Sequence, residues 1–135
     1  MATVNDPPGP AKPRKKVLIV DDSREMVDAI IRSLALAQGL DCDVAYDGAS
    51  AIEKIRACRP DLVLLDIRMP GIDGYEVCAM IRKEPGGKDT KVIIVSGALD
   101  MDGVEKAAQM GANDFLAKPF RNEFLRIKVE RILGL

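Results

Sequence analysis

The chain has 135 residues, of which 47% are hydrophobic and 30% charged, so it has the size and composition of one globular domain with its own core. Its 20 basic and 21 acidic residues give a net charge of −1. The chain therefore lacks the excess of basic residues that is typical of nucleic-acid-binding proteins. The chain contains no histidine, which excludes Ser-His-Asp and Cys-His catalysis, most zinc chemistry and phosphorylation of a histidine within the chain.

The first sixteen residues differ in composition from the rest of the chain. They combine four prolines with four basic residues and a single acid, namely Pro7, Pro8, Pro10, Pro13, Lys12, Arg14, Lys15, Lys16 and Asp6. Such a segment has too little apolar surface to offset the entropy lost on ordering, so we expect residues 1–15 to form a disordered basic, proline-rich tail. It has no signal-peptide pattern, and no apolar run in the chain approaches the ~20 residues of a membrane span.

From Lys16 onward, short apolar runs alternate with amphipathic segments. The runs predict buried strands at Val17–Val20, Leu62–Leu65 and Val92–Val95, and weaker ones at Asp43–Ala45 and Asp114–Ala117. Helical spacing predicts a first helix through Met26, Ile30 and Leu34 that ends at Gly39, and further helices over Gly48–Ala57, Tyr75–Lys83, Asp102–Met110 and Arg121–Leu133. This alternation predicts a doubly wound α/β fold with a five-stranded parallel sheet in the order 2-1-3-4-5 and helices on both faces.

Two details of this prediction concern side-chain burial. In the last helix we expect Phe124, Ile127, Ile132 and Leu133 to face the core. The three cysteines, Cys42, Cys58 and Cys78, are odd in number and widely spaced. This spacing favours buried free thiols in a reducing cytoplasm over a disulfide or a zinc site.

Polar residues follow four of the five predicted strands. Asp21 and Asp22 follow the first strand, Asp66 the third, Ser96 ends the fourth and Lys118 follows the fifth. Because the first and third strands are neighbours in the order 2-1-3-4-5, the three carboxylates converge at the carboxyl edge of the sheet. At about 4 Å and an effective dielectric constant of about 20, each like-charge pair costs roughly 4 kcal/mol. The site therefore needs either protonated carboxyls or a hard cation, for which Mg²⁺ is suited.

A cation among these acids makes Asp66 a candidate nucleophile toward phosphorus, with Lys118 as a second positive charge and Ser96 as a hydroxyl donor. Each residue also has a simpler explanation by itself. The two acids at 21 and 22 suit the N-terminus of the first helix, Ser96 suits a turn, and a lysine before a proline is usually solvated. Their joint occurrence at one end of the sheet favours the functional interpretation.

Four segments resemble the signature blocks of response regulator receiver domains: Val17–Ser23, Asp66–Gly74, Val95–Ala98 and Phe115–Phe120. The resemblance runs from about Lys16 to the C-terminus, in the family's order and spacing. It implies a flavodoxin-like (βα)5 receiver domain over residues 16–135 and a cis peptide bond between Lys118 and Pro119.

The resemblance further implies that Asp66 accepts a phosphoryl group from a phosphohistidine on a sensor histidine kinase or a histidine phosphotransfer protein. It implies Mg²⁺ as cofactor, held by Asp21, Asp22, Asp66 and the backbone carbonyl of Arg68, with Ser96 and Lys118 on the phosphoryl oxygens. We expect a cytoplasmic signalling protein of two-component systems that performs only its own phosphotransfer and dephosphorylation, with no nucleic-acid partner.

The family's switch couples the hydroxyl at position 96 to an aromatic ring on the fifth strand, here Phe115. Because this ring has no hydroxyl to keep in water, we predict that it is buried even in the resting state. We expect the surface formed by the fourth helix, fifth strand and fifth helix to bind a downstream partner.

Other functions remain open at this point. The short C-terminus favours a stand-alone regulator, and the alternative is the receiver portion of a longer response regulator. A magnesium-dependent aspartyl phosphatase of the haloacid-dehalogenase type is less favoured, because Arg68 stands where that class has its second acid. A flavodoxin-like flavin carrier is disfavoured because Asp21 and Asp22 would repel a phosphate at that position. A degenerate receiver is disfavoured because all five key positions are filled.

Overall fold

Five strands alternate with five helices in residues 14–97 and 101–135, the part of the chain that the computed structural model describes. The strands are β1 (Lys15–Val20), β2 (Leu40–Ala45), β3 (Leu62–Leu65), β4 (Lys91–Ser96) and β5 (Asp114–Ala117). The helices are α1 (Arg24–Leu34), α2 (Gly48–Cys58), α3 (Gly74–Lys83), α4 (Met101–Gln109) and α5 (Asn122–Leu133). The expected disordered tail over residues 1–15 lies almost wholly outside the described residues, and β1 begins one residue earlier than the expected domain boundary.

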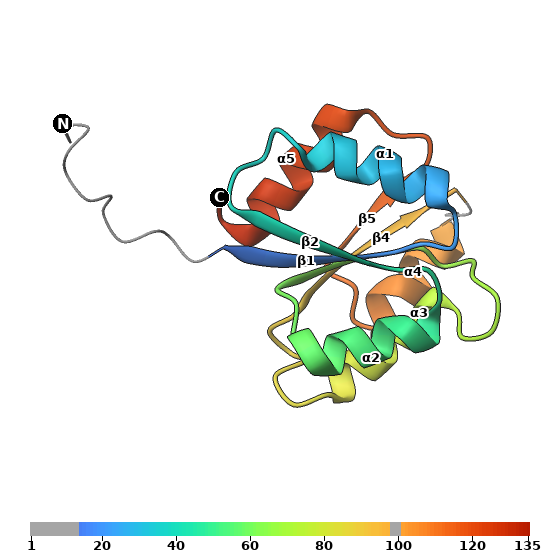
Figure 1. Cartoon of the computed structure of the whole chain (residues 1–135). Coiled ribbons are helices and arrows are strands. Elements are labelled where there is room, and N and C mark those ends of the chain that lie inside the picture. The colour runs from blue at the N-terminus through green and yellow to red at the C-terminus, as the bar shows by residue number, and fades with distance from the viewer. Residues whose placement is uncertain (1–13, 98–100) are drawn as a thin grey trace, which may run out of the picture.

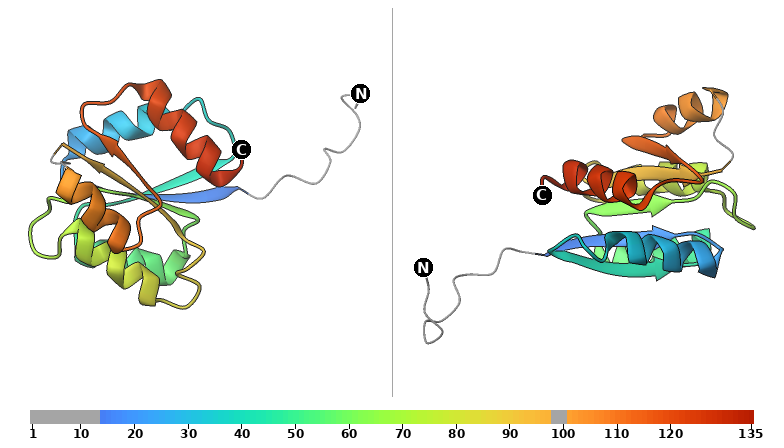
Figure 2. Two further views of the ribbon diagram at one scale, coloured as in Figure 1. Left: turned by 180° about the vertical axis from the view of Figure 1, so that it is seen from behind. Right: turned by 90° about the horizontal axis from the view of Figure 1, so that it is seen from above.

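The strands form one parallel sheet in the order β2-β1-β3-β4-β5, which confirms the predicted doubly wound fold. Figure 1 shows α1 and α5 on one face of the sheet and α2, α3 and α4 on the other, and Figure 2 shows the same layers from two further sides. All strands point the same way, so their carboxyl ends lie along one edge. That edge carries the polar residues identified from the sequence.

Two apolar layers hold the helices onto the sheet. Ile19, Ile93 and Leu125 belong to the layer under α1 and α5, and Leu65 and Ile81 belong to the layer under α2, α3 and α4. The central strands β1, β3 and β4 contribute side chains to both layers, which explains why their sequences read as continuous apolar runs.

The edge strands and the first helix depart from the sequence-based expectations. Strand β2 begins at Leu40 rather than Asp43, because an edge strand with one neighbour tolerates exposed acids such as Asp41. Helix α1 ends at Leu34, five positions before Gly39. The amides of Ala35 and Ala37 donate to carbonyls three residues earlier, a tighter turn that terminates the helix.

Side-chain burial differs from the prediction in α5 and at two cysteines. The buried residues of α5 are Leu125 and Val129, whereas Phe124 is 56% exposed and Ile127 is 41% exposed, so the expectation that these two face the core is wrong. Leu125 and Val129 form one apolar stripe of the helix, and Phe124 and Ile127 form another. Both stripes have helical spacing, and the packing of α5 against the sheet decides which of them is buried. Cys78 is buried as predicted, but Cys42 and Cys58 are exposed.

At the amino edge of the sheet, Arg82 of α3 connects two loops, the one from α3 to β4 and the one from α4 to β5. Its guanidinium donates hydrogen bonds to the carbonyl oxygens of Gly87, Thr90 and Gly111 and to the side-chain oxygen of Asn113. Position 87 also has room only for glycine, since a Cβ there would overlap the carbonyl oxygen of Ile81. The loop between α3 and β4 is therefore held in one conformation.

Candidate functional site

The candidate site is built at the carboxyl ends of four strands. Val20 at the end of β1 is in register with Leu65 at the end of β3, so Asp21 and Asp66 follow on adjacent strands. Ser96 at the end of β4 is in register with Ala117, the residue before Lys118. The predicted site residues thus come together from segments that are far apart in the sequence.

The three acids form one cluster, here called the acidic cluster (Asp21, Asp22 and Asp66). One carboxylate oxygen from each lies within 4.8 Å of the others. Asp21 is 1% exposed and Asp66 is 7% exposed, whereas Asp22 faces solvent. The ammonium of Lys118 donates a 2.7 Å hydrogen bond to Asp21 Oδ2 and lies 3.6 Å from Asp66 Oδ2.

Burial dominates the electrostatics of Asp66. It raises the pKa of this carboxyl, and the neighbouring Asp21 carboxylate raises it further. Lys118 and the backbone N–H groups of Ile67 and Arg68 act in the opposite direction and lower the pKa. One ammonium opposes three carboxylates, so the ionised cluster keeps an excess negative charge that a divalent cation would neutralise.

The donor set fits Mg²⁺, which prefers oxygen ligands and retains several of its own waters. Two of the acids are buried and can be held in fixed positions, and exposed Asp22 leaves the site open to solvent. The backbone carbonyl of Arg68 as a further ligand stays a prediction, and the Arg68 side chain is exposed. The Lys118–Pro119 peptide bond is cis, as expected.

Comparison with known proteins agrees with this geometry. The profile of the response regulator receiver domain matches residues 17–130. The chain belongs to this family. Receiver domains are signalling domains of two-component response regulators, and they generally bind Mg²⁺ at an acidic pocket of this kind.

Curated relatives of this receiver domain are about twice its length. Response regulator MprA of Mycobacterium ulcerans is 34% identical over 118 residues, which cover 87% of this chain and 50% of the relative. The DNA-binding response regulator MtrA of Mycobacterium leprae is 34% identical over 119 residues, which cover 86% of this chain and 50% of the relative. The chain therefore spans about half the length of these proteins.

Solved structures of similar size share the fold. The signal receiver domain of a putative Luxo repressor protein from Vibrio parahaemolyticus superposes with a TM-score of 0.83 at 29% identity, covering 90% of this chain and 91% of that one. Chemotaxis protein CheY4 of Vibrio cholerae superposes with a TM-score of 0.82 at 28% identity, covering 88% and 98%. These neighbours confirm the CheY-like fold of the receiver domain.

Backbone contacts around the acidic cluster show how the receiver domain fixes its acids. The backbone N–H of Ser23 donates to Asp21 Oδ1 at 2.9 Å, while the Ser23 hydroxyl caps α1 by accepting from Met26 N–H. Gly74 opens α3 and packs against the backbone of Asp66, where a Cβ would overlap the Asp66 carbonyl oxygen. The supporting role of Gly74 was missed from the sequence, and its only signal is the Asp-Gly pair at a predicted helix start.

Tyr75 is a second residue that the sequence analysis did not single out for a role at the site. It follows Gly74, and its hydroxyl donates to the Gly103 carbonyl in α4 at 3.3 Å. The Lys106 ammonium of α4 lies 4.4 Å from the centre of the Tyr75 ring. The segment that supports Asp66 is thereby joined directly to α4 of the receiver domain.

The prediction that Phe115 is buried in the resting state is wrong, because this residue is 42% exposed. Edge strand β5 has one neighbouring strand and covers the core only partly, so an apolar residue on it can face outward. Ser96 is 1% exposed and pairs with Ala117, which lies two positions after Phe115 on β5. Alternate residues of a strand point to the same face, so Ser96 and Phe115 both lie on the sheet face that carries α4. Beside the ring, α4 and β5 enclose a cavity of about 110 Å³, lined by Val104, Ala107, Ala108, Ala112, Asn113, Asp114 and Phe115.

Among the described residues, no helix is long and apolar enough to pass through a membrane.

Proposed function

We propose that this receiver domain is a phosphorylation-activated switch, with Asp66 as the residue that accepts the phosphoryl group. The observation that carries this proposal is the meeting of Asp66, Asp21 and Lys118 at the carboxyl edge of the sheet, with hydrogen-bond or ion-pair distances between them. Carboxylate attack on phosphorus needs the phosphoryl oxygens neutralised. Lys118 supplies one positive charge within reach of Asp66, and Ser96 adds a hydroxyl at the end of the neighbouring strand.

Mg²⁺ fits the acidic cluster, and when bound it would neutralise phosphoryl oxygens as they approach Asp66. The chain's own residues position the reaction. The Ser23 amide orients Asp21, Asp21 anchors the Lys118 ammonium, and Gly74 lets the start of α3 approach the Asp66 backbone. Asp22, which is exposed, completes the ligand set from the solvent side.

The phosphoryl donor in this proposal is a phosphohistidine on a sensor histidine kinase or on a histidine phosphotransfer protein. The chain has no histidine of its own, so the donor must be another molecule. Turnover of external phosphate esters is not proposed, since the residue two positions after Asp66 is the exposed Arg68 rather than an acid. The protein thus acts on itself and is no enzyme toward other substrates.

Output is proposed to pass through the surface of α4, β5 and α5. A hydroxyl at Ser96 that turns toward phosphoryl oxygens vacates volume on the α4 side of the sheet. The Phe115 ring is exposed beside a cavity of about 110 Å³ and can turn inward to fill this volume. The exposed apolar residues of this surface include Met101, Phe115, Phe124 and Ile127, and a partner would cover them.

The chain is proposed to act in the cytoplasm, where histidine kinases present their phosphohistidines. Two forms of output are compatible with the site: binding of a separate partner protein, or control of an attached output domain. The second is favoured by relatives of twice the length, and one of them is named as DNA-binding. Immunoblotting the native protein with an antibody to residues 16–135 distinguishes them, because an attached domain would roughly double the apparent mass.

Intact-mass measurement tests the phosphorylation proposal. The chain is incubated with a small-molecule phosphodonor and MgCl₂, and a single phosphoryl adduct is expected. The adduct should be absent in Asp66→Asn and when EDTA is added before the donor. Asp22→Asn is expected to slow its formation, whereas Asp114→Asn, a matched change of an acid away from the cluster, should leave it unchanged. An adduct that persists in Asp66→Asn would overturn the assignment.

A further inference from the structure

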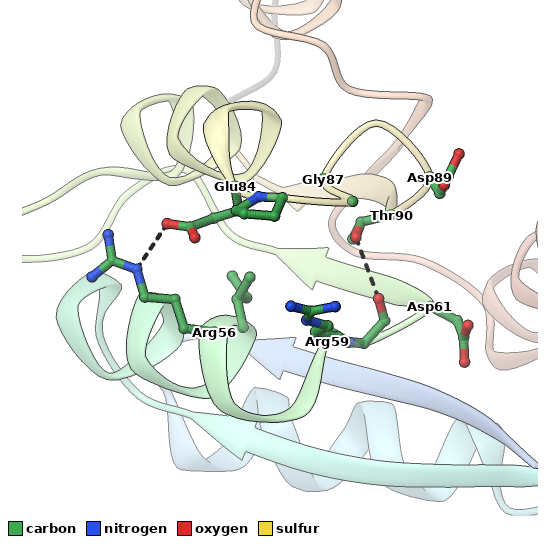
Figure 3. A pocket seen from close by; sticks show the side chains of 11 residues that line it. Arg56, Arg59, Asp61, Glu84, Gly87, Asp89 and Thr90 are labelled. Atoms are coloured by element: carbon green, nitrogen blue, oxygen red, sulfur yellow. Dashed lines mark hydrogen bonds and ion pairs between the residues drawn. The ribbon is translucent and has the colours of Figure 1, made fainter.

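A cavity lies at the amino edge of the sheet, opposite the acidic cluster. It has a volume of about 280 Å³ and lies between the end of α2 and the loop from α3 to β4. We call it the Arg59 pocket, and its lining residues are Ile55, Arg56, Arg59, Pro60, Asp61, Glu84, Pro85, Gly86, Gly87, Asp89 and Thr90. Figure 3 shows the Arg59 guanidinium between the two sides of the pocket, facing the loop that carries Gly87 and Thr90.

Two arginines and three acids line the pocket, and one arginine and one acid among them form an ion pair. Arg56 Nε donates to Glu84 Oε1 at 2.8 Å on one side, so these two charges compensate each other. The Asp61 carboxylate accepts the Lys16 backbone N–H at 2.8 Å, and in Figure 3 both Asp61 and Asp89 point away from Arg59. Arg59 is exposed, and within the described residues its guanidinium makes no hydrogen bond or ion pair.

The backbone at Arg59 provides an independent observation. Arg59 ends α2 in the left-handed conformation with φ 46°, and it is the one non-glycine residue of the described chain with positive φ. Glycine is the residue that this position favours, because a Cβ is strained there. Arg59 therefore holds a backbone conformation that glycine would adopt at lower cost, and this conformation places its side chain at the pocket.

The walls of the pocket are preformed. Thr90 Oγ1 donates to the Pro60 carbonyl at 3.4 Å and joins the two sides, and Arg82 donates to the carbonyls of Gly87 and Thr90. Ile55 and Pro60 are buried and give the pocket an apolar floor. A cavity with preformed walls, an apolar floor and an exposed guanidinium that has no protein partner suits a small anion that carries an apolar body.

We propose that the Arg59 pocket binds a small organic carboxylate. The guanidinium presents parallel N–H donors that match the two oxygens of a carboxylate, and the apolar body of the ligand lies against Ile55 and Pro60. The pocket is remote from the acidic cluster, so this site is independent of phosphoryl transfer. It gives the domain a second binding site at the opposite edge of the sheet.

Titration of the ¹⁵N-labelled full chain with sodium benzoate tests the proposal, at constant ionic strength and without Mg²⁺. Saturable shifts are expected at the amides of Gly86, Gly87 and Thr90, with Asp66 unaffected. Acetate should bind more weakly than benzoate, because it lacks an apolar body. The proposal is overturned if sodium chloride produces the same shifts, if no amide of the pocket saturates, or if inorganic phosphate saturates these amides and benzoate does not.

Substitutions at Arg59 separate recognition from folding. Arg59→Gly suits the left-handed backbone, so its melting temperature should equal or exceed that of the parent, while benzoate affinity falls about tenfold or more. Arg59→Lys keeps the charge but loses the paired donors, so its affinity for benzoate should lie between that of the parent and that of Arg59→Gly. Glu84→Gln removes the ion pair with Arg56 and should tighten benzoate binding about twofold to fivefold. Benzoate shifts that persist unchanged in Arg59→Gly would refute the site.

Discussion

Replacing Lys118 by methionine tests the electrostatics of the acidic cluster, because methionine has a similar length and no charge. The ammonium lies 2.7 Å from Asp21 Oδ2 and 3.6 Å from Asp66 Oδ2. At an effective dielectric constant of about 20, Coulomb's law assigns roughly 6 and 5 kcal/mol to these two contacts. Part of this is offset because the lysine no longer has to be desolvated, so we expect the unfolding free energy to fall by about 3–5 kcal/mol.

Urea denaturation in EDTA measures this loss. With a slope of about 1–3 kcal/mol per molar urea, the midpoint should fall by more than about 1 M. Lys128→Met is the matched control, since Lys128 pairs with Asp114 at 2.9 Å but both side chains are a third or more exposed. An exposed pair of this kind contributes about 0–1 kcal/mol. Added MgCl₂ should reduce the deficit of Lys118→Met and leave that of Lys128→Met unchanged.

The reasoning is refuted if Lys118→Met is as stable in EDTA as Lys128→Met. That result would mean that Asp21 and Asp66 are compensated by other groups, and that the excess negative charge inferred for the cluster does not exist. A deficit that is equally large with and without MgCl₂ would instead contradict the assignment of the cluster as a divalent cation site.

Three further outcomes are expected. The raised pKa of Asp66 means that the folded protein loses stability as the pH rises through that pKa. Urea titrations in EDTA should therefore find Asp66→Asn more stable than the parent at pH 7. The difference in unfolding free energy should vanish below about pH 4, where the carboxyl is protonated in both states. Equal stability at pH 7 would contradict the burial argument. Gly74→Ala should lower the unfolding free energy by about 1–3 kcal/mol and slow formation of the phosphoryl adduct, whereas Gly97→Ala, whose Cβ would have ordinary contacts, should do neither. Leu125→Ala should cost about 2–5 kcal/mol in thermal or urea unfolding and Phe124→Ala less than about 0.5, because only the first is buried; equal losses would contradict the burial assigned to α5.

The layout of the fold and site could be predicted because parallel sheets leave strong local signals. Strands buried on both faces read as unbroken apolar runs, and the polar residue after each run marks the edge of the sheet. Asp21, Asp66 and Lys118 were identified in this way, and the structure brings them together. Their proximity depends only on strand order and direction, both of which follow from the alternation of strands and helices.

Burial at the edges of the molecule could not be predicted, since it depends on which neighbour is present. Phe115 lies on an edge strand and Phe124 on the second apolar stripe of α5, and no local pattern distinguishes these from core positions. The Arg59 pocket was missed for a different reason. The local sequence does not distinguish a left-handed arginine at a helix end from one in the helical conformation, and the pocket exists only because the loop from α3 to β4 lies beside the end of α2.

The hydrogen bond between Lys118 and Asp21 joins residues 97 positions apart in the chain. Strands β1, β3, β4 and β5 must therefore have docked before an ammonium stands beside the acids, and a compact intermediate with β5 detached would lack it. Reactivity of Asp66 toward a small phosphodonor would then report assembly across these four strands, and it would distinguish such molecules from intermediates that already have their full helix content.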